Sequence, residues 1–395
     1  MNLHLLSGDR ERGIMAAGSK FERLVAHHPC GDLVHPWPGA TCRSEFLLMG
    51  RDGALGTTPY MLIFFLAKLV VGGAKGKALR EEINRLPLKI VRVSLLGATL
   101  ASGIVGSICG FRWLFGRFRW WFVGLGPGSV AGLLSILTQD ISEVRTFASY
   151  FYVAAVEYGV RKVIWRRKRM LVLETALFSA LSAALVRLQH LSKPTSLPWF
   201  FYPEKCPAQS EKEHSVACVD HGVRGAARLA TFGAILGGLR VVVPLARDLL
   251  NRRPVGGGAR SAAASAWSFP AFLAAYVALQ RWTRCLVAQN RGRDDGTAAA
   301  VSGAVAGLSY LLHPSLSILA AALASIGQLA VQDKVSGRWW PHLVFGLSTG
   351  WMLHARLNEP DHICPPFARI IFTECTRARA DRIIDDYKNI LQLNK

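Results

Sequence analysis

Two groups of cysteine and histidine residues have the side chains needed to hold a metal ion. Four of them, Cys206, His214, Cys218 and His221, fall within one short polar stretch. Thiolate and imidazole groups are the ligands of tetrahedral zinc sites. The spacing predicts a structural zinc site here. The competing interpretation is a polar connector that happens to be rich in these two residue types.

The second group lies near the N-terminus and contains His27, His28, Cys30, His35 and Cys42. Its spacing is not that of a zinc finger, and the prolines and glycine after His35 indicate an irregular loop. The alternatives are a metal site and a folded or disulfide-linked loop.

No set of residues points to a catalytic centre. The segment 346–350 reads Gly-Leu-Ser-Thr-Gly, but it lies inside an apolar helical stretch, whereas a nucleophile elbow joins a strand to a helix. We therefore expect no enzyme activity and no cofactor other than the zinc considered above. Glu157 and Glu174 stand within apolar stretches and are functional candidates for that reason. The alternative for Glu157 is an ion pair with Arg161 one helical turn later, and a similar pair with Arg169 is the alternative for Glu174.

The composition predicts a membrane protein. Of 395 residues, 51% are hydrophobic and 18% are charged, fewer than the quarter or so typical of soluble domains. The net charge is +21, but the basic residues cluster at the ends of apolar runs, as at 161–169. That is where membrane proteins place them, so we expect the lipid bilayer as a partner and no nucleic acid.

The apolar runs predict an all-α, polytopic membrane helix bundle. They are continuously apolar rather than alternating, as barrel strands would be, and several approach the twenty or so residues that a membrane-spanning helix needs. We expect eight to ten spans. The clear runs are 93–111, 120–139, 261–280, 296–312 and 314–332, and the weaker runs are 59–73, 146–160, 170–186, 224–250 and 339–353. The basic stretches 75–92 and 161–169, read as loops, fall on opposite sides, so the charge distribution does not orient the chain.

Glycines four residues apart predict close helix packing. Such pairs put both glycines on one helix face, where another helix can approach or a second copy of the chain can dock. The pairs inside apolar runs are Gly106 and Gly110, Gly128 and Gly132, Gly233 and Gly237, Gly303 and Gly307, and Gly346 and Gly350.

An internal repeat organises the chain. Phe-Arg-Trp at 111–113 precedes Gly-Ser-Val-Ala-Gly-Leu at 128–133, and Gln-Arg-Trp at 280–282 precedes Gly-Ala-Val-Ala-Gly-Leu at 303–308. We predict two similar glycine-rich repeats. The expected regions are an N-terminal Cys/His-containing region (1–53), a first transmembrane repeat (54–186), a polar Cys/His connector (187–223), a second transmembrane repeat (224–358) and an amphipathic C-terminal tail (359–395).

Several of these stretches resemble the transmembrane protein 135 family. The similar residues are His35-Pro36 and Cys42 to Leu47 near the N-terminus, the region 120–162, and Asp294-Asp295 followed by 304–309. The residues from Met15 to Lys20 resemble that family's usual start. The glycine-rich repeats also look like those of the Tim17, Tim22, Tim23 and Pmp24 group. The connector at 187–222 departs from the family pattern.

The resemblance implies a multi-pass protein of mitochondrial membranes, peroxisomal membranes or both. It implies a regulator of the balance of mitochondrial fission and fusion and of peroxisome organisation or lipid metabolism, acting through protein partners on the organelle surface. The alternative is a transporter or pore for a small or lipid-like solute at the repeat interface. A transporter should line that interface with polar side chains such as Ser102, Thr138, Glu157 or His313, and a scaffold should fill it with small apolar ones.

Overall fold

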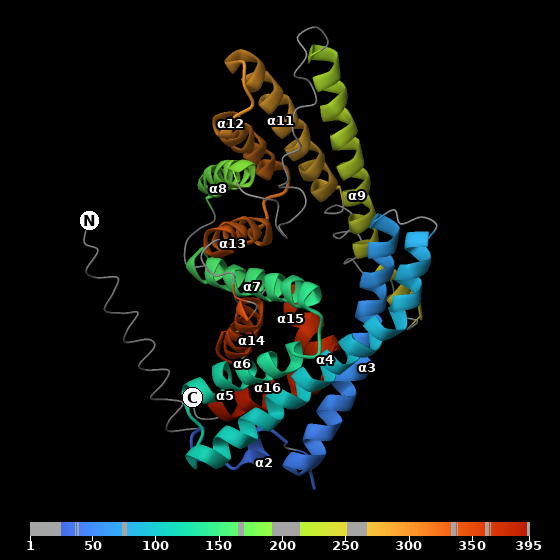
Figure 1. Ribbon diagram of the computed structural model, residues 1–395. Coiled ribbons are helices and arrows are strands. Elements are labelled where there is room, and N and C mark those ends of the chain that lie inside the picture. Colours follow the sequence, from blue (N-terminus) through green and yellow to red (C-terminus); the bar gives the residue numbers. More distant parts are fainter. Residues whose placement is uncertain are drawn as a thin grey trace, which may run out of the picture. The chain divides into compact units, whose positions relative to one another are not determined.

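The computed structural model is built from helices (Figure 1). It describes residues 25–72, 77–164, 170–191, 214–250, 267–332 and 337–392, apart from residues 36, 38, 338, 360–362 and 364. Across these ranges no strand occurs, which confirms the all-α prediction.

The helices group into two compact units. Unit 1 contains Met1–Lys162 and Gly337–Lys395, and unit 2 contains Val163–Ser336. Unit 2 is therefore one continuous segment, whereas unit 1 is built from both ends of the chain. The boundaries of the two units are set by contacts between helices, and they differ from the boundaries of the regions predicted from the sequence. Those regions stay a prediction.

Unit 1 is organised around two long helices, α3 (Cys42–Gly72) and α4 (Lys77–Phe115). Residues 77–92, expected as a loop, form the first part of α4. The two helices run antiparallel and cross where Gly53 meets Gly97. A methyl group on Gly53 would lie 2.4 Å from the carbonyl oxygen of Gly97, so only glycine allows this crossing.

Five further helices belong to unit 1, and α6 packs on three of its neighbours, α4, α5 and α14. The five helices are α2 (Cys30–Leu33), α5 (Trp120–Val123), α6 (Leu125–Ile136), α7 (Ile141–Ile164) and α14 (Trp340–Asn358). Phe151 of α7 contacts Phe345 of α14 at a ring-centre distance of 4.6 Å, and both rings are buried. Burial of such apolar surface stabilises the unit.

The C-terminal segment folds back onto unit 1. It contains α15 (Pro365–Ala368), the π-helix η4 (Arg369–Glu374) and α16 (Arg379–Gln392). Ile384 and Tyr387 of α16 are buried in the core with Leu33 and Val34. The helix α16 is amphipathic, as the sequence predicts for the tail, and its apolar side chains are covered by protein.

Unit 2 contains α8 (Leu171–Leu191), α9 (His214–Leu250), α11 (Ser268–Arg291), α12 (Gly296–Gly307), η2 (Leu308–Leu312) and α13 (Leu316–Gln332). Helix α12 packs on both α8 and α11, and α11 also packs on α9. The aromatic rings of Phe178, Phe272, Tyr276 and Tyr310 are buried together.

Two helices of the described chain are long and apolar enough to cross a membrane by length and composition. One is residues Ile83–Phe115 within α4, and the other is α8, Leu171–Leu191. Trp121–Ile136, Gly296–Leu312 and Leu316–Leu329 are apolar but shorter. The structure thus supports the coarse prediction of apolar spanning helices at two places, fewer than the eight to ten expected.

Candidate functional site

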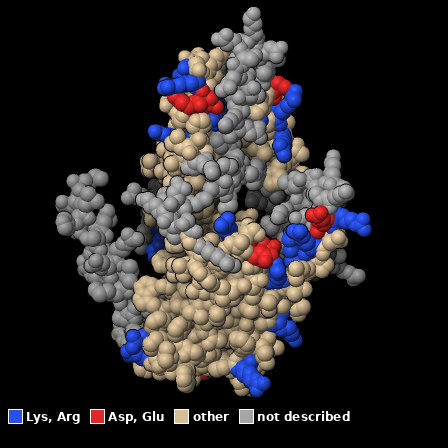
Figure 2. Space-filling view, in the orientation of Figure 1, with Lys and Arg blue, Asp and Glu red and all other residues tan. Residues whose placement is uncertain are grey.

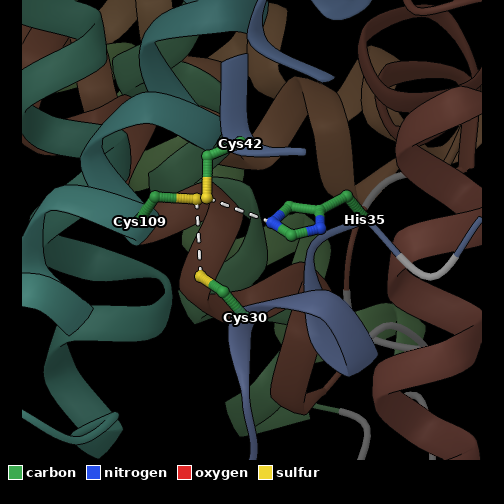
Figure 3. A group of neighbouring side chains, drawn as sticks. All are labelled: Cys30, His35, Cys42 and Cys109. Carbon is green, nitrogen blue, oxygen red and sulfur yellow. Dashed lines mark hydrogen bonds between the residues drawn. The ribbon is translucent and has the colours of Figure 1, made fainter. Parts of the chain in front are cut away.

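Three thiols and one imidazole converge in unit 1. They belong to Cys30, the first residue of α2, to His35 just beyond α2, to Cys42 at the start of α3 and to Cys109 near the end of α4. Figure 3 shows the four side chains pointing toward one another from these separate segments. We call them the Cys/His cluster.

The four donor atoms of the Cys/His cluster all lie within 4.8 Å of one another. The Sγ atoms of Cys30 and Cys109 are 3.4 Å apart, and Nε2 of His35 lies 3.2 Å from Sγ of Cys42. His35 is buried, Cys30 and Cys109 are half-buried and Cys42 is exposed. The cluster is therefore compact and open to solvent on one side.

The register of the α3–α4 hairpin explains how Cys42 reaches Cys109. Gly53 of α3 faces Gly97 of α4. One turn further from that crossing, Gly50 faces Ser102, and a methyl group on Gly50 would lie 3.4 Å from Cβ of Ser102. Gly106 next faces Phe46, whose ring would lie 3.1 Å from a methyl group on Gly106. Because the helices are antiparallel, one more turn places the first residue of α3 beside Cys109.

Local interactions favour the thiolate form of Cys30. The pKa of its thiol is lowered to about 7, chiefly by the hydrogen bond with Cys109. A further hydrogen bond with Cys42 and the positive charge of Arg112 act in the same direction, and burial opposes them. Because the thiolate is the form that binds a metal, this lowered pKa favours metal binding by Cys30.

The predicted quartet in the connector is only partly described. Cys206 and the side chain of His214 lie outside the described residues. Cys218 is a half-buried cysteine of α9, and the backbone carbonyl of His221 accepts a hydrogen bond of 2.8 Å from Arg281. The zinc prediction for this quartet stays a prediction.

An apolar cavity of about 700 Å³ lies in unit 1 beside the Cys/His cluster. Most of its lining is aliphatic or aromatic. Among the described residues, the lining includes Glu143 but no Lys, Arg or His. Tyr150 and Ile370 belong to the lining and are also exposed, so the cavity reaches the outside of the unit there. Its size lies within the range of roughly 300–1,000 Å³ found for small-molecule sites.

The glycines predicted to pack helices occupy different environments. A methyl group on Gly128 would lie 2.7 Å from Cα of Gly350, and one on Gly132 would lie 3.0 Å from Cα of Gly346, where α6 crosses α14. Gly106 contacts a side chain, the ring of Phe46. Gly110 is exposed, and an added methyl there would meet no described atom within 4 Å.

Unit 2 has an equivalent crossing of α12 and α8. A methyl group on Gly303 would lie 2.6 Å from the carbonyl oxygen of Ser182. One on Gly307 would lie 2.4 Å from Cα of Ser179. We call the α6–α14 and α8–α12 crossings the glycine seams. They are closed by backbone contact and leave no room for a solute.

The buried carboxylates have partners inside the protein. Glu157 pairs with Arg161 at 2.7 Å, which confirms the predicted ion pair one turn apart. Glu174 accepts a hydrogen bond of 3.2 Å from the hydroxyl of Tyr310. Arg169 lies outside the described residues, so the pair predicted with it stays a prediction.

The other side chains expected to line a wet interface are also bonded within their units. The hydroxyl of Ser102 donates to the carbonyl of Ala98, and Thr138 donates to the carbonyl of Ser135. Nδ1 of His313 lies 2.8 Å from the hydroxyl of Ser268. These contacts resemble ordinary helix packing and capping rather than the wall of a polar path.

Sequence reasoning missed two features of unit 1. Cys109 was not assigned to the N-terminal cysteine group, because the hairpin that brings it there spans most of α3 and α4. The Gly53–Gly97 crossing was missed because each helix supplies one glycine rather than a pair four residues apart. Small residues recurring along both α3 and α4 were the available signal.

No protein-family model matches this sequence, and no solved structure matches it.

Proposed function

We propose that this chain is a multi-pass membrane protein that holds a lipid-like molecule in the apolar cavity of unit 1. The family resemblance favours a role of this lipid binding in lipid metabolism at mitochondrial or peroxisomal membranes. The cavity is the observation that carries the proposal.

The outward faces of the helices support residence in a membrane. On α8, Leu171, Val172 and Leu173 are exposed, and on α14, Leu343 and Leu347 are exposed. Figure 2 shows a broad area over the helices of unit 1 in which Lys, Arg, Asp and Glu lie mainly at the margins. Together with the exposed aliphatic side chains named above, a surface with so few charged groups (Figure 2) fits contact with lipid better than contact with water.

Tryptophans near helix ends fit the same proposal. Trp113 is 86% exposed near the end of α4, and Trp267 and Trp339 are exposed directly before α11 and α14. Indole rings are enriched at the two interfaces of a bilayer, where an apolar ring and a polar N–H are both solvated.

The proposed internal duplication is supported by helix order and packing. In chain order α4, α6, α7 and α8 correspond to α11, α12, α13 and α14. The hexapeptide Gly-x-Val-Ala-Gly-Leu lies on α6 and, in the second set, runs from α12 into η2. Helix α6 packs on α14, the last helix of the second set, and α12 packs on α8, the last helix of the first. Each set thus packs its glycine-bearing helix on the last helix of the other set, and this matching pair of contacts supports a duplication.

The chemistry of the cavity indicates how a ligand would enter it. Because the described residues of the lining include no basic group, a carboxylate or phosphate inside would lose its hydration without gaining a partner among them. A hydrocarbon chain has no such penalty: relative to water it gains about 0.8 kcal/mol for each methylene group buried, and relative to the bilayer it exchanges one apolar environment for another. We therefore assign the interior to an acyl or isoprenoid chain, with any polar headgroup at the mouth near Tyr150 and Ile370.

The transporter alternative placed the solute at the repeat interface. In each unit that interface is a glycine seam, and both seams are closed by backbone contact. The cavity lies elsewhere, among α3, α4, α7 and the C-terminal segment. This arrangement favours storage or presentation of a lipid over passage between the repeats. Regulation of mitochondrial fission and fusion or peroxisome organisation through protein partners stays a proposal that rests on the resemblance.

The proposal is tested by purifying the full chain from membranes in a mild detergent and analysing bound lipids by native mass spectrometry. We expect a retained lipid in the wild type. Ile104→Trp, which fills the cavity from α4, should lose it, and so should Ile383→Trp from α16. Leu95→Trp on the exposed face of α4 is the matched control and should keep it.

Two outcomes would contradict the proposal. The chain could be recovered in the soluble fraction after alkaline extraction of membranes, which removes the membrane assignment. The wild type and both cavity variants could also carry the same lipids in the same amounts, which removes the cavity as their site.

A further inference from the structure

Weak hydrogen bonds do not account for the Cys/His cluster. A thiol is a poor donor and a poor acceptor, so three sulfur atoms gathered around one imidazole gain little from each other. One disulfide would join only two of them. Using all four donors at once requires a central atom that binds each.

The spacing of the donors fits a tetrahedral metal ion. Zinc–sulfur bonds of about 2.3 Å and zinc–nitrogen bonds of about 2.0 Å place neighbouring ligand atoms about 3.5–3.8 Å apart at tetrahedral angles. The separations of 3.4 Å between Cys30 and Cys109 and 3.2 Å between His35 and Cys42 need a small expansion to reach those values. The other separations are at most 4.8 Å, so side-chain rotations of about an ångström bring all four donors to one ion.

We infer that Cys30, His35, Cys42 and Cys109 form a structural Zn²⁺ site. Three thiolates and an imidazole are a recurrent ligand set of structural zinc, and the absence of carboxylate or carbonyl ligands in the cluster disfavours calcium and magnesium. The exposed position of Cys42 gives the ion a path of entry. All four coordination positions are protein side chains, so the ion has a structural rather than a catalytic role.

The position of the cluster gives the zinc a mechanical role. The chain between Cys30 and His35 contributes Leu33 and Val34 to the wall of the apolar cavity, and Ile108, next to Cys109, contributes from α4. Zinc would tie the wall segment to the α3–α4 hairpin and hold the cavity closed on this side. This link rests on the proposed function, whereas the zinc site does not.

The zinc site is tested on the full chain purified without added metal, by mass spectrometric metal analysis. We expect zinc bound in a one-to-one ratio and loss of that zinc in Cys109→Ser and in His35→Ala. Cys218→Ser, in the connector quartet, and Cys375→Ser, outside both groups, are matched controls that should keep it. As a measurement independent of variant folding, Co²⁺ supplied to the wild type should give the thiolate-to-metal absorption of a tetrahedral sulfur site.

Three results would overturn the zinc site. They are a wild type without zinc, a zinc content that depends on Cys218 but not on Cys109, and a disulfide between Cys30 and Cys109 in the protein as isolated.

The role of the zinc in closing the cavity is tested by removing the ion from the wild type with a chelator and following the retained lipid. We expect faster loss of lipid and faster proteolysis near residues 25–35. Lipid retention that is unchanged after zinc removal would overturn the closing role while the zinc site stands. A wild type that binds zinc but no lipid would instead contradict the proposed function.

Discussion

Gly128 of α6 and Gly350 of α14 face each other so closely that a methyl group on Gly128 would lie 2.7 Å from Cα of Gly350. The backbones of the two helices are therefore in direct contact. Such contact gains van der Waals packing that larger side chains would prevent, and it is the usual means of helix association where no hydrophobic driving force acts between helices.

Replacing Gly350 should destabilise unit 1. In Gly350→Ala the new methyl would lie 2.3 Å from the backbone carbonyl oxygen of Leu125, which cannot move without shifting α6. We expect a loss of about 1–3 kcal/mol, typical of overpacking. The measurement is the thermal unfolding midpoint in detergent.

Gly159→Ala on α7 is the control for that substitution. A methyl there meets no described atom within 4 Å, so the usual gain in helix propensity of about 0.5–1 kcal/mol should remain. Equal effects of the two substitutions would contradict the seam as a close contact.

Removing Arg379 should release the C-terminal segment. Its guanidinium bonds to Asp52 at 2.8 Å and to both oxygens of Glu45 at 3.2 Å, and both carboxylates are buried. Arg379→Met leaves them without this partner, at a cost of about 3–5 kcal/mol. The exposed Arg382, substituted in the same way, should have little effect on the unfolding midpoint.

The same variant should show a characteristic pH dependence. The pKa of Glu45 is raised, chiefly by burial, and Arg379 opposes that rise. When folding raises the pKa of an acid, the folded state is favoured at low pH, where the acid is protonated. That contribution to the free energy of unfolding is lost as the pH rises through the pKa of the folded state. Arg379→Met should raise this pKa further, so its deficit should be larger at pH 7 than at pH 4. Adding Glu45→Gln should reduce the deficit at pH 7, and a deficit independent of pH would contradict this account.

Asp295 should give unit 2 an acid-sensitive helix start. Its carboxylate caps α12 by accepting from the backbone N–H groups of Thr297 and Ala298, at 3.0 and 2.9 Å. These bonds and Arg291 lower its pKa to about 2, the largest cause being the bond from Ala298. Because folding lowers this pKa, the ionised carboxylate stabilises the folded state above the ordinary pKa of an aspartate. That contribution is lost as the pH falls through about 2. Any midpoint difference between wild type and Asp295→Asn at pH 5 should vanish near pH 2, and its persistence there would argue against the cap.

The hydroxyl pair of Tyr276 and Ser182 should be coupled. Their oxygens lie 2.6 Å apart in the core of unit 2. Tyr276→Phe alone removes one partner and should cost about 1–3 kcal/mol, because the serine hydroxyl stays buried. Adding Ser182→Ala should cost less than the sum of the two single changes. Strict additivity in the unfolding midpoints would show that the pair does not interact.

Helix content could be read from the sequence, whereas helix partners could not. Continuous apolar runs predict helices because the backbone then satisfies its own hydrogen bonds. The many charged residues in 77–92 favoured a loop in the prediction, whereas this stretch forms the first turns of α4. The pairing of α6 with α14 depends on contacts between distant segments, and a glycine face does not specify which helix will cover it.

The Cys/His cluster shows the same limit at the scale of a site. Three of its members, Cys30, His35 and Cys42, stood close enough in sequence to raise the question of a metal. The fourth, Cys109, lies in an apolar helix, where a lone cysteine reads as a small hydrophobic residue. Only the register of the α3–α4 hairpin brings it to the others.

The packing of α6 on α14 has a consequence for biosynthesis. Translation finishes every helix of unit 2 before α14 of unit 1 is made, although unit 1 starts first. Until then the glycine face of α6 lacks α14, and the part of unit 1 that is made first remains incomplete. A premature stop codon between α13 and α14 would therefore leave unit 2 complete and unit 1 without α14 and the C-terminal segment, although most of unit 1 is translated first.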